Sequence, residues 1–248
     1  MEQVLLVTGA SRGIGAATAL LAARKGYAVA VNYTANEKAA QDVVGRIRAE
    51  GGKAIAVQAD VAEEEQVLAL FQTVDAQLGR LTALVNNAGV IDVTARLDEM
   101  SVARLKRMFD INVIGSMVCA REAVRRMSTR HGGNGGAIVN VSSAAARLGA
   151  PGQYLDYASA KGAIDTFTVG LAKEVAAEGI RVNAVRPGLI DTEIHASGGL
   201  PDRVQQLAHL VPMQRGGSAE EVAEAIVWLL SSQSSYVTMS MIEVSGGR

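Results

Sequence analysis

The chain has 248 residues, of which 49% are hydrophobic and 20% charged, and its formal net charge is −1. This composition is typical of a globular protein with one sizeable core, and the low charge argues against a basic surface that binds nucleic acid or anionic membranes. The start lacks the pattern of a signal peptide, and no segment approaches the ~20 apolar residues of a membrane helix. We therefore expect a cytoplasmic protein.

Apolar runs rich in β-formers alternate with longer helical patterns along the whole chain. Strands are predicted at residues 3–8, 28–33, 53–58, 83–87, 137–142, 180–187 and 239–244. Helices are predicted at residues 14–25, 36–50, 62–79, 99–130, 157–178 and 219–230. This alternation predicts an α/β fold, a doubly wound Rossmann sheet of seven mostly parallel strands with helices on both faces. No Pro-rich linker marks a boundary, so one domain should span residues 1–248.

Metal chemistry has little support in the sequence. Cys119 is the only cysteine, which excludes an intrachain disulfide and a multi-cysteine metal site. The three histidines, His131, His195 and His209, lack the spacing of metal ligands. We expect no metal.

The first predicted strand runs directly into Gly9-Ala-Ser-Arg-Gly13-Ile-Gly15 and then into an Ala-rich helix. A glycine turn at this junction brings backbone N–H groups and a helix N-terminus toward a pyrophosphate. The simpler alternative is an ordinary left-handed turn that leads into a helix. The position between a first strand and a helix favours dinucleotide binding.

Tyr157 and Lys161 are four residues apart in YASAK, so they share one face if this segment is helical. An ammonium close to a phenol favours the phenolate and lowers the pKa of the phenol toward the working range. Ser143, in NVSS, could donate a hydrogen bond to a substrate carbonyl. Alone, such a Tyr–Lys pair is usually ordinary helix surface, so the interpretation depends on the rest of the chain.

Several further motifs occur in a fixed order: TGASRGIG, Asp60-Val61, NNAG, Asn112, NVSS, YASAK and Pro187-Gly188. Together they resemble the short-chain dehydrogenase/reductase family over essentially the whole chain, most closely its 3-oxoacyl-(acyl-carrier-protein) reductase and glucose 1-dehydrogenase branches. The resemblance implies an NAD(P)-dependent enzyme acting on CH–OH groups. It implies the catalytic residues Asn112, Ser143, Tyr157 and Lys161. It also implies the cofactor-binding residues Gly9, Ser11, Arg12, Gly13, Ile14, Gly15, Tyr33, Asp60, Val61, Asn86, Ala88, Gly89, Tyr157, Lys161, Pro187, Gly188, Ile190 and Thr192.

Two catalytic assignments require a choice between neighbouring residues. Side chains alternate along a strand, so only one of Ser142 and Ser143 can face the cleft, and the family pattern selects Ser143. Tyr154 is a rival phenol, but position 158, four residues on, is Ala rather than Lys. Tyr157 is therefore the predicted acid–base residue.

Other interpretations of single residues stay open. Asp60 could be an acid at a helix start, and Arg12 could be a solvated loop arginine. Asn112 could cap or kink its helix, whereas the resemblance implies that it holds a water beside the lysine. Met239 and Ser240 stand where many relatives have Gly followed by Gln or Ser, which suggests altered packing there.

The expected reaction is reversible hydride transfer between a nicotinamide cofactor and a carbonyl or secondary alcohol, in a ketone, 3-oxoacyl or sugar-like substrate. NADP(H) is expected over NAD(H), because strand two ends in Asn32, Tyr33 and Thr34 without a carboxylate that would repel a 2′-phosphate. Arg12, and secondly Lys38, could add positive charge. The alternatives are an inactive dinucleotide-binding sensor and a sugar-nucleotide epimerase-like enzyme, which usually has a longer C-terminal domain.

The helix at 157–178 carries an apolar stripe, and the resemblance implies a homotetramer built on this helix and on the one at 99–130. Alternatively, the stripe packs within its own chain. The stripe consists of Ile164, Phe167, Leu171 and Val175.

Residues 190–217 are predicted to form a substrate lid with a short helix near 201–210. Polar lid residues could meet the substrate, and leucines could pack on the sheet, with His195 belonging to the lid rather than to the catalytic set. The polar candidates are His195, Ser197, Arg203 and Gln206, and the leucines are Leu200, Leu207 and Leu210.

Overall fold

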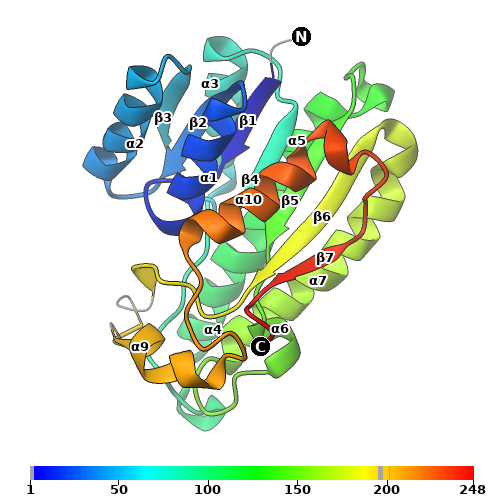
Figure 1. Cartoon of the computed structure of the whole chain (residues 1–248). Helices are drawn as coiled ribbons and strands as arrows, with labels where there is room; N and C mark the ends of the chain where they lie inside the picture. The colour runs from blue at the N-terminus through cyan, green and yellow to red at the C-terminus, as the bar shows by residue number, and fades with distance from the viewer. Residues whose placement is uncertain (1–2, 195–197, 201) are drawn as a thin grey trace.

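The computed structural model describes residues 3–194, 198–200 and 202–248. Seven strands form one sheet in the order β3-β2-β1-β4-β5-β6-β7, and every neighbouring pair is parallel (Figure 1). The strands are β1 (Gln3–Val7), β2 (Tyr27–Tyr33), β3 (Ala54–Gln58), β4 (Ala83–Asn86), β5 (Gly136–Val141), β6 (Ile180–Pro187) and β7 (Met241–Val244). The strand order reverses between β1 and β4, and parallel α/β sheets bind ligands beside such a switch point.

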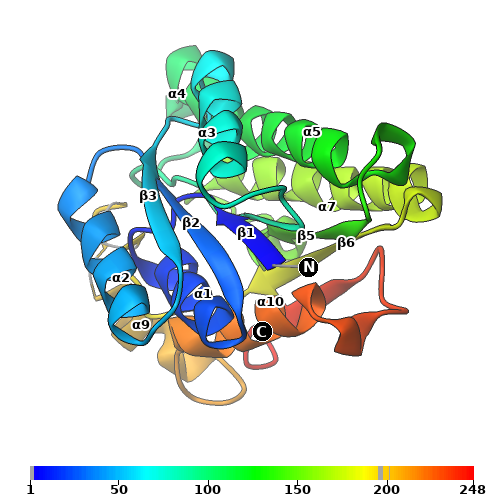
Figure 2. The ribbon, with the colours of Figure 1, turned by 90° about the horizontal axis from the view of Figure 1, so that it is seen from above.

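Helices cover both faces of the sheet, as seen from above in Figure 2. One face carries α1 (Gly13–Arg24), α2 (Glu37–Ala49) and α10 (Ala219–Leu230). The other carries α3 (Glu64–Gln77), α4 (Val102–Phe109), α5 (Gly115–Met127) and α7 (Leu155–Val175). Each layer encloses its own apolar core. Strands covered on both faces need apolar side chains at nearly every position, which explains the continuous runs in the sequence. The predicted fold class is confirmed.

The helix predicted at 99–130 is divided into three parts. A π-helical segment, Asp110–Ile114, lies between α4 and α5, and Asn112 is at its centre. The Asn112 amide donates to the carbonyl of Met108 at 3.0 Å and to that of Val90 at 3.1 Å, so the side chain ties the widened turn to the loop after β4. A π-bulge is frequent at functional sites.

The lid region contains α9 (Arg203–Leu207) and a 3-10 turn at Ala208–Leu210, close to the short helix predicted near 201–210. Val204 packs with Leu189, Val211 and Leu207 in a small separate core. Leu210 does not pack as expected, because it is 53% exposed. Two predicted lid residues, at 195 and 197, lie outside the described residues.

The apolar stripe of α7 packs within its own chain. Ile164 and Val175 are buried, and Phe167 and Leu171 pack against the core beneath α7. This is the alternative that the sequence left open, so the stripe gives no support to assembly. A search of the described residues for a helix long and apolar enough to span a membrane finds none.

Candidate active site

The glycine loop after β1 leaves the N-terminus of α1 open. Gly9 and Gly13 have positive φ angles of 61° and 54°, which glycine adopts without strain. A Cβ on Gly15 would lie 2.5 Å from the amide nitrogen of Asn87, so only glycine fits this approach of α1 to the sheet. The N-cap residue, Arg12, makes no side-chain cap, and the first turn contains no acid. The first backbone N–H groups of the helix can therefore bind an anion.

The residues after β4 brace the centre of the sheet. The Asn86 amide donates to the carbonyl of Ser116 and to the side-chain oxygen of Asn140, both at 3.0 Å. The Asn87 amide donates to the backbone carbonyls of Thr8 and Gly9 at 2.8 and 3.0 Å. These contacts hold the glycine loop and the end of β4 together.

Gly89 lies close to both Asn112 and Lys161, two of the predicted catalytic residues. A Cβ on Gly89 would lie 2.7 Å from Oδ1 of Asn112 and 3.6 Å from Nζ of Lys161. Ala88 approaches the glycine loop equally closely, because a Cβ on Gly9 would lie 2.9 Å from its Cα. The strand end thus joins the cofactor loop to the catalytic candidates.

The two neighbouring serines have different environments. Ser142 is 2% exposed, and its hydroxyl donates to the backbone carbonyl of Lys161 at 3.3 Å. Ser143 is only partly buried and is in hydrogen-bond contact with Tyr157. Both serines follow the end of β5, and the hydroxyl of Ser143, rather than that of Ser142, is the one that meets the phenol.

Lys161 is buried beside Tyr157, one helical turn away on α7. Its ammonium donates to the carbonyl of Val141 at 2.8 Å and lies 5.5 Å from the centroid of the Tyr157 ring. Burial lowers the pKa of Lys161 to about 8, and nearby Asp165 opposes this effect. An ammonium whose pKa lies this close to neutrality can gain or lose a proton under working conditions.

The expected lowering of the Tyr157 pKa by Lys161 is not observed. Burial raises the pKa of the phenol, and the hydrogen bond with Ser143 only opposes this rise. The physical reason is desolvation of the phenolate, together with a lysine that is bonded to Val141 and faces the ring. Tyr157 consequently keeps its proton at neutral pH.

The loop after β6 closes the site from the other side. Gly188 donates its N–H to Val244 at 3.0 Å, and a Cβ there would lie 2.7 Å from the Cα of Ser245. A Cβ on Gly13 would lie 3.4 Å from the methyl group of Thr192. The glycine loop and the start of the lid therefore approach each other at the site, and Pro187 and Ile190 are both buried.

Three of the predicted cofactor-binding residues, Tyr33, Asp60 and Val61, lie at or just after the ends of β2 and β3. Asp60 accepts a hydrogen bond from the N–H of Ala62 at 3.0 Å, and Val61 is 5% exposed within the apolar core. Tyr33 is also buried, and burial followed by the charge of Glu37 raises the pKa of its phenol. Glu37, in the first turn of α2, is thus a carboxylate near the end of β2, where the sequence analysis expected none that would repel a 2′-phosphate.

Comparisons with known proteins agree with this arrangement. The family model described as enoyl-(acyl carrier protein) reductase matches residues 9–248. The uncharacterized oxidoreductase YgfF of Escherichia coli (strain K12) is 58% identical over 245 residues, with 99% of each chain covered. The chain belongs to the short-chain dehydrogenase/reductase family.

Other relatives of this dehydrogenase/reductase act on different substrates. Cis-4-hydroxycyclohexanecarboxylate dehydrogenase of Sinomonas cyclohexanicum is 43% identical, with 99% of this chain and 96% of the relative covered. A 3-oxoacyl-(acyl-carrier-protein) reductase of Synechocystis sp. is 39% identical with the same coverage. A solved variant of the Serratia marcescens short-chain dehydrogenase/reductase superimposes with a TM-score of 0.91 at 33% identity, covering 99% and 97%. The enzyme is an oxidoreductase of a family that binds nicotinamide cofactors, and the predicted resemblance is confirmed.

One cavity of about 420 Å³ joins these parts of the enzyme. Ser143, Tyr157 and Lys161 line it together with Ile14 of the glycine loop and Thr192 of the lid. The cavity is large enough for a small-molecule ligand.

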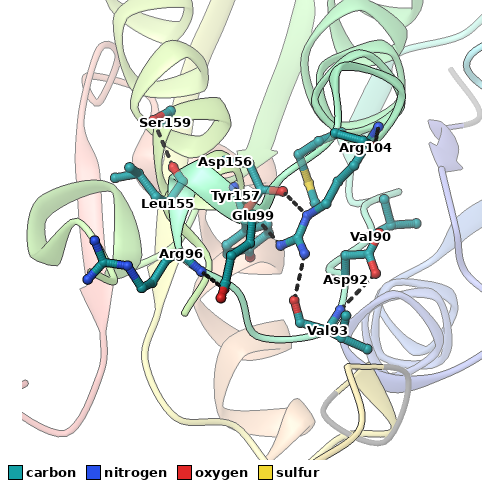
Figure 3. A network of polar contacts seen from close by, with 12 residues as sticks. Val90, Asp92, Val93, Arg96, Glu99, Arg104, Leu155, Asp156, Tyr157 and Ser159 are labelled. Carbon is teal, nitrogen blue, oxygen red and sulfur yellow. Dashed lines mark hydrogen bonds and ion pairs between the residues drawn. The ribbon is translucent and has the colours of Figure 1, made fainter. Parts of the chain in front are cut away.

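A buried ion pair beside Tyr157 was not predicted (Figure 3). The Arg104 guanidinium donates to the Asp156 carboxylate at 2.8 Å and to the carbonyl of Val93 at 2.8 Å. Asp156 also accepts from the backbone N–H of Tyr157 at 2.9 Å. The pair thus connects α4, the loop after β4 and the first turn of α7. Arg104 and Asp156 are 52 positions apart, so the sequence contained no local signal for their contact.

Proposed function

We propose that the enzyme catalyses NADP(H)-dependent hydride transfer between nicotinamide and a carbonyl or secondary alcohol. The observation that supports this most directly is a single cavity that Ser143, Tyr157 and Lys161 share with the glycine loop. The open N-terminus of α1 and the tight glycine approaches fit a pyrophosphate.

When bound, the cofactor supplies or accepts the hydride. In the direction of reduction, Ser143 donates a hydrogen bond to the carbonyl oxygen and stabilises the negative charge that grows there. Tyr157 holds its proton at neutral pH and donates it to the same oxygen. Lys161 provides positive charge beside the phenol, and Asn112 holds the loop after β4 against the lysine.

Purified enzyme is to be incubated with NADPH and a panel of ketones, 3-oxoacyl thioesters and oxidised sugars, and the loss of nicotinamide absorbance followed. We expect turnover of at least one class. The absence of turnover with either NADPH or NADH, in either direction, would contradict the proposed reaction.

The preference for NADP(H) is supported by the exposed Arg12 at the start of α1. Its side chain can reach a 2′-phosphate on the ribose side, and a charge-assisted contact typically changes affinity roughly tenfold or more. Glu37 in the first turn of α2 opposes this preference. We expect a higher kcat/KM with NADPH than with NADH, and a loss of that preference in Arg12→Met but not in Lys38→Met. A clear preference of the wild type for NADH would refute it.

We also propose a homotetramer and a cytoplasmic location. Two observations support an assembly face. A Cβ added to Gly162 or Gly170 of α7 would meet nothing within 4 Å, and the apolar side chains of Ile114, just before α5, and Met117, in α5, are exposed. Light scattering at micromolar concentration is expected to give four times the chain mass of 25.8 kDa, and a value of one chain would reject assembly.

A further inference from the structure

The side chains that line the active-site cavity carry more positive than negative charge. Among the described residues that line it are three basic side chains, those of Lys161, Arg203 and Arg248, and no aspartate or glutamate. Much of the remaining wall is apolar, including Ile91, Leu148 and Leu189. A cationic site with low-dielectric walls concentrates anions.

Arg203 lies against the two residues that precede α7. Its guanidinium lies 5.1 Å from the centroid of the Tyr154 ring, and one N–H donates to the side-chain oxygen of Gln153 at 2.7 Å. Gln153 and Tyr154 immediately precede α7, in whose first turn Tyr157 lies. The guanidinium is thus held on the same wall as the proposed proton donor.

The side chain of Arg203 is fixed but not neutralised. Within the described part of the chain, no carboxylate lies within ion-pair distance of it, whereas Arg104 and Arg186 each bind an aspartate. Its neighbour Val204 anchors α9 in the small core with Leu189 and Val211. A guanidinium has five N–H donors arranged to match a carboxylate, and the contact with Gln153 accounts for only one.

We propose that the enzyme acts on carbonyl or alcohol substrates that carry a carboxylate, and that Arg203 binds this carboxylate. The proposal rests on the proposed function, since it adds a second recognition point to the same site. Tyr157 and Ser143 receive the reacting oxygen, the apolar wall receives the carbon skeleton, and Arg203 receives the charge. Tyr154 holds the guanidinium by its ring face, and Gln153 fixes its orientation. Lys161 is not assigned to the carboxylate because its ammonium is buried against the ring of Tyr157 and donates to Val141.

The test compares oxo acids with their methyl esters, which keep the skeleton but remove the charge. The panel comprises levulinate, its longer linear homologues and oxocyclohexanecarboxylates, assayed with saturating NADPH. We expect at least one acid to exceed its ester in kcat/KM by roughly tenfold to hundredfold, mainly through KM, as for a charge-assisted contact. Arg203→Met should abolish the difference between acid and ester, and Arg203→Lys should restore part of it. Arg46→Met, at an exposed position of α2, is the matched control and should change nothing.

The variants also separate recognition from a structural role of Arg203. If it only attaches α9 to α7, Arg203→Met will lower the melting temperature and affect acid and ester equally, which overturns the proposal. Arg248→Met tests the other guanidinium of the cavity, and loss of the acid preference in that variant alone also overturns the assignment to Arg203.

The result can be distinguished from failure of the proposed function. Turnover of neutral ketones with no preference for any acid leaves the reaction intact and refutes the carboxylate site. If no compound is turned over, the same acids are titrated calorimetrically into the protein with NADP, to test the carboxylate site by binding alone. Binding to the wild type but not to Arg203→Met supports the site, and the absence of binding refutes it.

Discussion

The catalytic floor and the lid of this enzyme are constructed in different ways. The floor is here the four predicted catalytic residues, Asn112, Ser143, Tyr157 and Lys161. The side chains of Asn112 and Lys161 donate to the backbone carbonyls of Val90 and Val141 on neighbouring segments. In the described part of the lid, residues 190–217, the short helix α9 packs on a small apolar cluster. Reacting groups need fixed geometry, whereas substrate recognition tolerates an element that moves. The two walls of the cavity therefore differ in what holds them, which is hydrogen bonding to backbone carbonyls in the floor and apolar packing around α9 in the lid.

The largest expected effect is on the stability of the floor. Arg104→Met leaves the Asp156 carboxylate, with 0% of its side chain exposed, without its partner. Breaking such a buried pair should lower the free energy of unfolding by about 3–5 kcal/mol, measured in urea. The control Arg96→Met removes a pair whose side chains are 73% and 71% exposed, and should cost less than about 1 kcal/mol. If both variants lose an equally small free energy of unfolding, the buried Arg104–Asp156 pair stabilises the protein no more than an exposed pair does.

The next prediction concerns the reacting group of the floor. Tyr157→Phe keeps the ring but removes the proposed proton donor, so kcat should fall by roughly 10²-fold or more. NADPH binding, measured by fluorescence, should persist because the glycine loop and Lys161 are unchanged. Tyr154→Phe is the matched control, since that ring lines the same cavity, and it should leave kcat nearly unchanged. An inactive Tyr154→Phe beside an active Tyr157→Phe would reverse the assignment.

A third prediction follows from the pKa of Lys161, which burial lowers to about 8. Below that pH the ammonium is charged and supports reduction, and above it the charge is lost. The kcat/KM for NADPH reports the free enzyme and should fall by about tenfold per pH unit above pH 8. In the Lys161→Arg variant the guanidinium stays charged at all these pH values. Its kcat/KM should be lower than that of the wild type but should not fall above pH 8. A wild-type profile that stays flat well above pH 8 would contradict the role of Lys161.

The smallest effect is expected in the lid. Val204→Ala removes part of the apolar cluster that holds α9. A loss of about 1 kcal/mol in the packing that positions α9 should raise KM for the substrate roughly fivefold. The kcat and the unfolding midpoint should change little, because the floor does not depend on this cluster. A large fall in kcat would show that floor and lid are not independent.

Local sequence patterns were enough to predict the strands of the sheet and the part of the site that lies on α7 and the glycine loop. Strand positions followed from nearly continuous apolar runs, because strands covered on both faces need them. Tyr157 and Lys161 share a face of α7 because their spacing is that of one helical turn, and the glycine loop follows from the steric needs of its backbone. These features depend on neighbours within a few residues of each other, which is the range that a sequence pattern encodes.

The contacts between side chains of distant segments, and the effect of burial on their pKa values, became visible only in the folded chain. Folding placed Arg104 against Asp156, set Arg203 on the ring of Tyr154, and divided the helix at 99–130 by a π segment around Asn112. It also raised the pKa of Tyr157, contrary to the expectation from the nearby lysine. Desolvation and long-range contacts depend on the whole packed arrangement of elements, and no local spacing in the chain specifies that arrangement.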